Sequence, residues 1–285
     1  MKRCIYLFRS EVKKTDYAAP PLPVVLTILL LIGPVCLAQP AGSAAATGET
    51  DLARQTQNPV ASLISVPLQG NWDFGLGSRE AVGTTLNIQP VLPFTLTRNT
   101  NLILRIILPV TSQPASDGSR INGLGDILMT AFFSPQKTGK VIWGIGPAFL
   151  LPVATHQAIG SEKFGLGPSA VALVQPGKFT VGILFNHVWS AAGAEVRTDV
   201  NTSYGQPFLS YNLGKGLALG VSSEITTNWK AEQKTTAPLL FAVSKVALLG
   251  RQPVNFTWAA GPTLTSPEGG PEWRFRFQTN FLFPR

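Results

Sequence analysis

The sequence predicts an all-β protein, a transmembrane antiparallel up-and-down β-barrel of about 12 strands. Strand-length segments alternate polar and apolar residues with a period of two, which is the periodicity of a β-strand. Charged residues make up only 13% of the 285 residues, about half the roughly 25% of a typical globular domain. After residue 38, no apolar run reaches the ~20 residues of a membrane-spanning helix. Low charge without such helices is typical of a barrel that faces lipid.

The segment at residues 272–283 shows the alternation most clearly. One face carries aromatic residues and a threonine, and the other carries Arg274, Arg276, Gln278 and Asn280. A soluble sheet hides its apolar face in a packed core, but here the opposite face holds two arginines at neighbouring positions. Lipid on the outside and a water-filled lumen on the inside explain both faces.

Glycine, proline, asparagine and serine divide the chain from residue 62 onward into 12 such segments. They cover residues 62–76, 84–97, 101–111, 123–134, 141–153, 164–175, 179–190, 201–213, 216–229, 235–246, 252–263 and 272–283. The first and ninth segments alternate as regularly as the last. An even number of strands of this length fits a tilted crossing of an outer membrane.

The connections predict the orientation. Short connections follow the even segments and longer ones follow most odd segments, with residues 230–234 as the exception. Outer-membrane barrels have short periplasmic turns and longer outer loops, so we predict that both termini are periplasmic. Aromatic residues then fall near both ends of the strands, which predicts a girdle at each membrane interface. Its members are Trp72, Trp189, Trp229 and Trp273 at the outer ends, and Trp143 and Phe283 at the inner ends.

Residues 1–38 are predicted to be a signal peptide. A basic start precedes an apolar run at residues 24–32, and small residues lie near the expected cleavage site. A helical membrane anchor is disfavoured by the shortness of this run and by the prolines around it. A lipoprotein at Cys36 is disfavoured because Val35 is too bulky for the usual lipoprotein signal.

Residues 39–61 are predicted to be a linker that leads into the barrel domain at residues 62–285. Residues 39–48 are small and show no periodicity. Residues 50–56 are predicted to form one or two helical turns, with Thr50 as the N-cap. This segment is either a plug or periplasmic tether, or a partly ordered leader into the first strand.

Charge and cysteine content exclude several functions. The formal net charge is +8, and residues 1–38 hold five basic and two acidic residues, so +5 remains for the rest. No basic patch with interleaved aromatic residues occurs, which disfavours nucleic-acid binding. Cys4 and Cys36 both lie in the predicted signal peptide, so a mature chain would have no thiol for a disulfide or a metal. We predict no cofactor.

The two histidines do not predict catalysis or metal binding. His156 lies in a predicted outer loop with no second ligand nearby. His187 shares its strand face with Phe185 and Trp189, whereas Asn186 and Ser190 point to the other face. A catalytic triad is therefore unsupported, and the chain is predicted not to be an enzyme.

Glycine pairs recur within the predicted strands, for example at Gly144 and Gly146 and at Gly165 and Gly167. Glycines two residues apart lie on one strand face. There they admit curvature or leave room in the lumen.

The inward-facing polar residues are the candidate pathway. Closing the barrel pairs the last strand with the first, which would bring Arg274 and Arg276 near Asp73 and Asn71. Two interpretations remain open: a cationic lumen wall that favours anionic solutes, and a salt bridge that holds the closure together. The full set of lumen-lining candidates is Gln69, Asn71, Asp73, Glu224, Arg274, Arg276 and Gln278. Arg105 is a weaker candidate because Ile103 and Ile107 share its face.

Several motifs resemble a family of bacterial outer-membrane barrels described as putative transporters. The family is related to the barrel proteins of the meta-pathway of phenol degradation and is sometimes mislabelled neuromedin U. The motifs lie at residues 51–59 (DLARQTQNP), 65–69 (SVPLQ), 87–90 (NIQP), 107–109 (ILP), 143–147 (WGIGP), 175–177 (QPG) and 281–285 (FLFPR). The resemblance covers about residues 50–285 and implies a pore, but supplies no binding residues. Outer-membrane barrels often end on an aromatic residue, whereas here Pro284 and Arg285 follow Phe283.

Together these features predict an outer-membrane channel or passive transporter for small, aromatic or anionic solutes. The expected partners are outer-membrane lipid, the small-molecule solute and, during biogenesis, the barrel-assembly machinery. Two alternatives stay open: an outer-membrane barrel with a structural or enzymatic role, and a soluble secreted β-barrel that binds a ligand.

Overall fold

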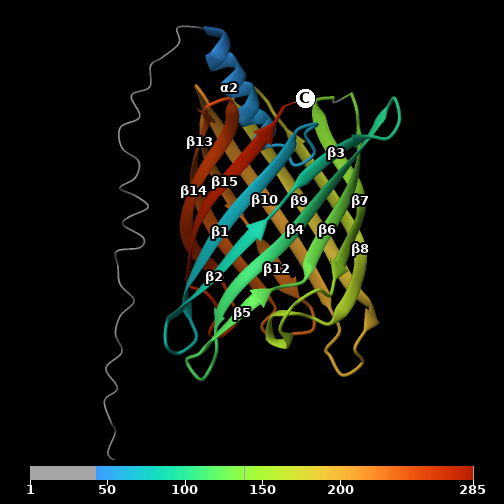
Figure 1. The fold of residues 1–285 in the computed structure, drawn as a ribbon, viewed down its shortest axis with the longest axis vertical. Helices are drawn as coiled ribbons and strands as arrows, with labels where there is room; N and C mark the ends of the chain where they lie inside the picture. Colours follow the sequence, from blue (N-terminus) through green and yellow to red (C-terminus); the bar gives the residue numbers. More distant parts are fainter. Residues whose placement is uncertain (1–42, 138, 285) are drawn as a thin grey trace, which may run out of the picture. The chain divides into compact units, whose positions relative to one another are not determined.

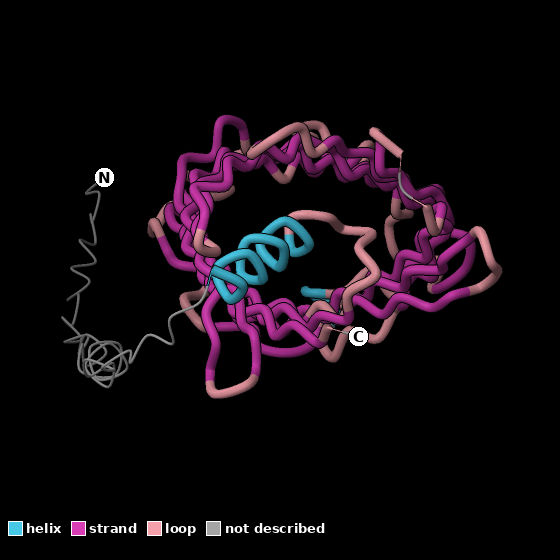
Figure 2. The backbone as a smooth tube through the Cα atoms, turned by 90° about the horizontal axis from the view of Figure 1, so that it is seen from above, coloured by secondary structure: helices cyan, strands magenta, loops and turns pink. Residues whose placement is uncertain are grey.

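The computed structural model describes residues 43–137 and 139–284, and the signal peptide predicted at residues 1–38 lies outside them. The described part of the chain is all-β and forms a closed 12-strand antiparallel barrel. The prediction of the fold class is confirmed. Figure 1 shows the tilted strands from the side, and Figure 2 shows the ring that they form when viewed along the barrel.

The wall is made from 15 strand segments. They are β1 (Ile64–Leu76), β2 (Ala81–Ile88), β3 (Val91–Thr95), β4 (Thr100–Pro114), β5 (Arg120–Leu124), β6 (Ile127–Pro135), β7 (Val141–Leu151), β8 (Lys163–Val174), β9 (Phe179–Gly193), β10 (Asn201–Gly214), β11 (Leu217–Ser223), β12 (Ile225–Asn228), β13 (Thr235–Leu249), β14 (Gln252–Thr265) and β15 (Trp273–Phe283). Three of the predicted strands are each broken into two segments, namely β2 with β3, β5 with β6, and β11 with β12, so the wall has 12 strands. The alternation in the sequence predicted each of these strands but not the breaks.

Closure is made by β1 and β15, which pair antiparallel along the whole of β15 from Ile64↔Phe283 to Phe74↔Trp273. Every other wall strand pairs antiparallel with its neighbours in sequence, so the topology is up-and-down throughout. A closed sheet leaves no row of unpaired backbone groups at an edge. This closure allows the strands to cross an apolar medium.

The break between β11 and β12 falls at Glu224. Pro207 on β10 and Pro238 on β13 lie in the registers that flank this break. Proline has no N–H to donate, so the ladder toward β11 and β12 is weakened here, whereas Pro207 and Pro238 still pair with β9 and β14. The prolines therefore mark the point where the wall presents Glu224 to the interior.

The tight connections lie at one end of the barrel and the longer loops at the other, as predicted. The C-terminal end of β15 and the helix α2 (Ser43–Thr56) lie at the end with the tight turns (Figure 1). The longest loop, residues 152–162, lies at the opposite end and contains the 3-10 helix η1 (Gln157–Ile159). Neither helix in the described ranges has the length and apolar character that a membrane crossing requires.

Helix α2 begins at Ser43, earlier than the prediction of a helix at residues 50–56 and a linker before it. Residues 44–46 are alanines, which have the highest helix propensity, so the helix starts before the predicted N-cap at Thr50. Helix α2 lies mostly beyond the strand ends in the side view (Figure 1), and the loop after it runs inside the ring of strands in the view along the barrel (Figure 2).

Residues 53–63, here called the inserted segment, bind the inner wall. Arg54 donates from Nη2 to the Gln175 carbonyl at 2.9 Å, and Gln175 Nε2 donates back to the Arg54 carbonyl at 3.0 Å. Thr180 Oγ1 donates to Gln57 Oε1 at 2.7 Å, and Gln57 Nε2 donates to Asn212 Oδ1 at 3.0 Å. These contacts join the segment to β9, to the end of β10 and to the turn after β8.

An apolar cluster fixes the same segment inside the barrel. Val60 is 5% exposed and packs with buried residues of β4, β6, β8 and β9 that point inward: Ile103, Phe132, Val171, Leu173 and Leu184. The lumen at this end is therefore filled on the side of β4 to β9 by hydrophobic packing.

Two members of the predicted glycine pairs lie where the neighbouring backbone leaves no room for a side chain. A Cβ on Gly146 would lie 1.8 Å from the Ala131 carbonyl oxygen, and one on Gly167 would lie 1.8 Å from the His187 carbonyl oxygen. No side chain fits at that distance. Only glycine lets β7 approach β6, and β8 approach β9, as closely as this wall requires.

A charged cluster in the barrel lumen

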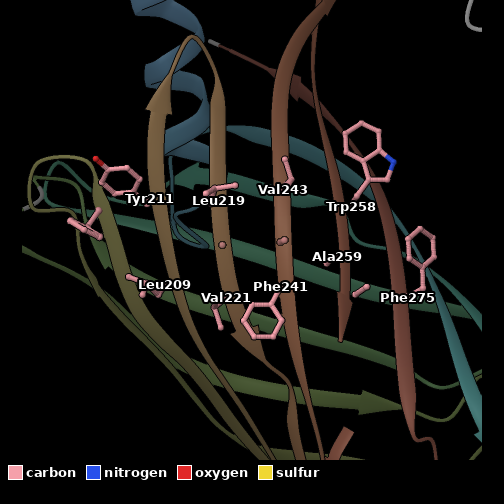
Figure 3. Close-up of a pocket in the computed structure, with 13 residues that line it drawn as sticks. Leu209, Tyr211, Leu219, Val221, Phe241, Val243, Trp258, Ala259 and Phe275 are labelled. Atoms are coloured by element: carbon pink, nitrogen blue, oxygen red, sulfur yellow. The ribbon is translucent and has the colours of Figure 1, made fainter. Parts of the chain in front are cut away.

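The two faces of the wall differ in polarity in the way the alternation predicted. On β15, Arg276 and Asn280 point inward and are 6% and 5% exposed, whereas Trp273 points outward and is 53% exposed. The outer wall is apolar. It includes a hollow of about 520 Å³ over β10 to β15, where Leu219, Phe241 and Trp258 stand on neighbouring strands (Figure 3).

The arginines of β15 are held by ion pairs at the closure. Arg274 donates to both carboxylate oxygens of Asp73, from Nε at 2.6 Å and from Nη2 at 3.0 Å. Arg276 donates from Nε to Asn71 Oδ1 at 2.7 Å. The register explains both contacts, because Asp73 lies opposite Arg274, and Asn71 lies opposite Arg276. A bidentate guanidinium–carboxylate pair is among the stronger polar contacts in proteins, so it reinforces the closure.

Glu224 joins both arginines from another part of the wall. Its Oε2 accepts from Arg276 Nη2 at 2.6 Å and from Arg274 Nη1 at 3.1 Å. Glu224 lies at the break between β11 and β12, and β13 and β14 separate this break from β15. These side chains therefore meet inside the lumen, between strands that are not neighbours in the wall. The contacts narrow the lumen and also hold the closure together.

Arg105 on β4 completes the cluster and differs from the other arginines. Its Nη2 donates to Gln89 Oε1 at 2.8 Å, and no carboxylate of the described residues lies within 4.0 Å of its guanidinium. The sequence predicts Arg105 as a weaker lumen candidate because Ile103 and Ile107 share its face. In the structure that face points into the lumen, which is partly apolar here.

Five residues, here called the charged cluster, thus bring three positive and two negative charges together: Asp73, Arg105, Glu224, Arg274 and Arg276. Arg274 pairs with both Asp73 and Glu224, and Arg276 pairs with Glu224. The positive charge of Arg105 is the excess within the cluster.

Gln69 and Gln278 extend the polar inner wall toward the end with the tight turns. They lie opposite each other across the closure, and Gln69 is 7% exposed. Gln278 lines the space next to Thr56 of the inserted segment. The structure therefore places all of the predicted lumen candidates on the inner face of the wall.

Open space remains on both sides of the charged cluster. A cavity of about 450 Å³ on the side of the long loops contacts Arg105, Tyr204 and Glu224. A second cavity of about 200 Å³ lies between the inserted segment and the wall of β10 to β14, and its polar lining includes Ser210, Ser222, Ser244 and Thr257. Gly220 and Ala242 also line it and leave it wide because they are small.

The residues predicted as aromatic girdles lie on the outer face near the strand ends. Trp189, Trp229 and Trp273 are 48%, 50% and 53% exposed toward the end with the long loops. Trp72 lies at the same end, with its ring centroid 5.6 Å from that of Phe275. Trp143 is the third residue of β7 and Phe283 ends β15, so both lie at the end with the tight turns.

The sequence pattern did not place Ser203 beside His187, because the two residues lie on neighbouring strands. Ser203 of β10 lies opposite His187 of β9, and His187 Nδ1 is 2.7 Å from Ser203 Oγ on the outer face. Trp229 Nε1 also donates to this hydroxyl at 2.9 Å. Nε2 of His187 is buried and has no hydrogen-bond partner among the described residues. The pair therefore lacks the third group that orients and charges the imidazole in a triad.

His156 has a structural role in the long loop at residues 152–162. Its Nδ1 accepts from the backbone N–H of Ala158 at 3.1 Å and caps η1. The described residues contain no group of three or more His, Cys, Asp or Glu side chains that could hold a metal ion.

A closed antiparallel barrel with an apolar exterior and a polar, charged interior is the architecture of outer-membrane β-barrels. Among solved structures, the chain is similar to an outer membrane channel from Pseudomonas putida F1, with 15% identity and a TM-score of 0.59, over 78% of this chain and 94% of that one. It is also similar to the NanC porin, with 11% identity and a TM-score of 0.48 over 77% and 100% of the two chains. A third is the outer membrane phospholipase A from Escherichia coli, with 10% identity and a TM-score of 0.42 over 77% and 92%.

The first of these similarities supports the fold assignment. No protein-family model matches the sequence, and no curated protein matches it.

Proposed function

We propose that the protein is an outer-membrane channel or passive transporter for small solutes, with a preference for anions. The observation that carries this proposal is the charged cluster inside a closed barrel, with open space on both of its sides. An excess of positive charge at a narrow point lowers the electrostatic barrier for anions and raises it for cations.

The orientation follows the general rule for outer-membrane barrels. The tight turns and both described chain ends would face the periplasm, and the long loops would face outward. The two levels of exposed tryptophan and phenylalanine would then lie at the two lipid–water interfaces. The apolar wall between them would contact acyl chains, and the barrel-assembly machinery would insert the chain.

The inserted segment is proposed to act as a fixed plug at the periplasmic end. It binds the wall through Arg54 and Gln57 and buries Val60 among lumen-facing hydrophobic residues. The cavity beside it, lined by Ser210, Ser222 and Ser244, leaves a polar passage along β10 to β14. Solutes would pass through this gap rather than through the centre of the barrel.

Two finer assignments belong to the same proposal. The motifs at residues 51–59 and 143–147 favour membership of the transporter family related to the phenol-degradation barrels. No catalytic role is proposed for His187 and Ser203, because their pair has no third group and hydrogen-bonds to Trp229 at the proposed interface.

Planar-bilayer recording of the purified protein tests the proposal. We expect discrete conductance steps in potassium chloride, with a reversal potential under a salt gradient that shows chloride more permeant than potassium. A barrel that inserts but carries no current would overturn the channel. Current with a cation preference would overturn the proposed selectivity.

A further inference from the structure

The cavity of about 450 Å³ on the long-loop side of the charged cluster has two chemically different walls. One wall is aliphatic and comes from β4, β6, β7 and β9, through Ile107, Leu128, Leu150 and Val188. Apolar surface in contact with water is unfavourable, so an apolar group of a solute that covers this wall would be stabilised. The aliphatic wall therefore indicates a solute with an apolar part.

The other wall of the same cavity presents polar groups that are not fully used. Arg105 has Gln89 as its hydrogen-bond partner and no carboxylate within 4.0 Å among the described residues. Asn186 is 3% exposed, and its Nδ2 has no hydrogen-bond partner in the described part of the chain. A buried amide donor without a partner is unfavourable unless a ligand or water binds it.

The charge balance of this wall limits the ligand to one negative charge. Arg105 can hold a carboxylate or a similar planar anion through two parallel N–H groups. Glu224 lines the same cavity, and its carboxylate would repel a second anionic group. Arg274 and Arg276 do not change this balance, because Asp73 and Glu224 already pair with them.

We propose that this cavity is a binding site for a small monoanion with a compact apolar body. The anionic group would bind Arg105 and accept from Asn186 Nδ2, and the apolar body would lie against Leu128, Leu150 and Val188. The site rests on the proposed channel function and adds the solute class to it. Because the wall is aliphatic, the apolar body can be aromatic or saturated.

Isothermal titration calorimetry of the purified full barrel in detergent tests the site without any need for conduction. We expect benzoate and cyclohexanecarboxylate to bind with similar affinity. Acetate lacks the apolar body and benzyl alcohol lacks the charge, so each should bind at least about tenfold more weakly than benzoate. Equal affinities for benzoate and acetate would overturn the site.

Two variants assign the binding to the two walls. Arg105→Gln should weaken benzoate binding by about tenfold or more, since it removes a charge-assisted bidentate contact. Arg120→Gln is the matched control, because Arg120 donates to Ser112 and the Val82 carbonyl outside this cavity, and it should bind benzoate like the unmodified protein. Benzoate affinity that is unchanged in Arg105→Gln would contradict the proposal.

Val188→Thr keeps the shape of the aliphatic wall and replaces one methyl group with a hydroxyl. It therefore tests the aliphatic wall even if Arg105→Gln fails to fold. It should weaken benzoate binding and leave the weak binding of acetate unchanged. Equal benzoate affinity in Val188→Thr and the unmodified protein would overturn the role of this wall. Bilayer current without benzoate binding would refute the site alone, whereas benzoate binding without current would refute the channel alone.

Discussion

At the scale of single residues, the partners of each arginine distinguish those that hold the barrel closed from Arg105, which has no carboxylate partner among the described residues. Arg274 and Arg276 had two interpretations from the sequence, and their contacts with Asp73, Asn71 and Glu224 show that they hold the closure together. The register of an up-and-down barrel was enough to predict the first two of these contacts. The contact with Glu224 could not be predicted, because it joins strands that are not neighbours in the wall.

Arg276→Gln and Glu224→Gln should shift the ion selectivity in opposite directions. The first removes one of the three positive charges and leaves the charged cluster with no net charge, so the preference for chloride should fall. The second removes a negative charge and should raise it. Reversal potentials in planar bilayers measure both, and a shift in the same direction for both variants would contradict the account.

The same variants should also be less stable than the unmodified protein. Arg276 and Glu224 are nearly buried, so the loss of one partner leaves the other without full compensation and costs about 3 kcal/mol. Arg251→Gln, in an exposed turn, serves as the control and should have no effect. The urea concentration that unfolds half of the barrel measures this loss.

At the scale of elements, the strands were predictable and the segment before them was not. Period-two alternation and turn residues placed every wall strand within a few residues. The inserted segment carries no comparable pattern, since its burial depends on the lumen around it. The pairing of His187 with Ser203 was missed for the same reason, because cross-strand neighbours depend on the register rather than on spacing in the sequence.

Deletion of residues 39–60 should raise the single-channel conductance several-fold, because it removes the segment that fills one side of the lumen. Arg251→Gln, in the exposed turn before β14, leaves the segment in place and is the matched control. This variant should conduct like the unmodified protein. An unchanged conductance after the deletion would show that the segment does not narrow the path.

At the scale of the whole molecule, one sheet separates two environments. Its outer face carries aromatic and aliphatic side chains, and its inner face carries the charged cluster and the two cavities. The low charge content and the strand alternation of the sequence were sufficient to predict this division. The position of the cavities was not predictable, because it depends on where the inserted segment and the aliphatic wall fill the lumen.

Nitroxide labels at two adjacent residues of β15 test this division most directly. Phe277 and Gln278 lie next to each other in the sequence, and the account places the first in lipid and the second in the wet lumen. Single cysteines at these positions, with Cys4 and Cys36 changed to serine, would be labelled in the barrel reconstituted into lipid vesicles. Power-saturation spectroscopy should show contact with dissolved oxygen at position 277 and with a water-soluble nickel complex at position 278. The opposite accessibilities would contradict the account.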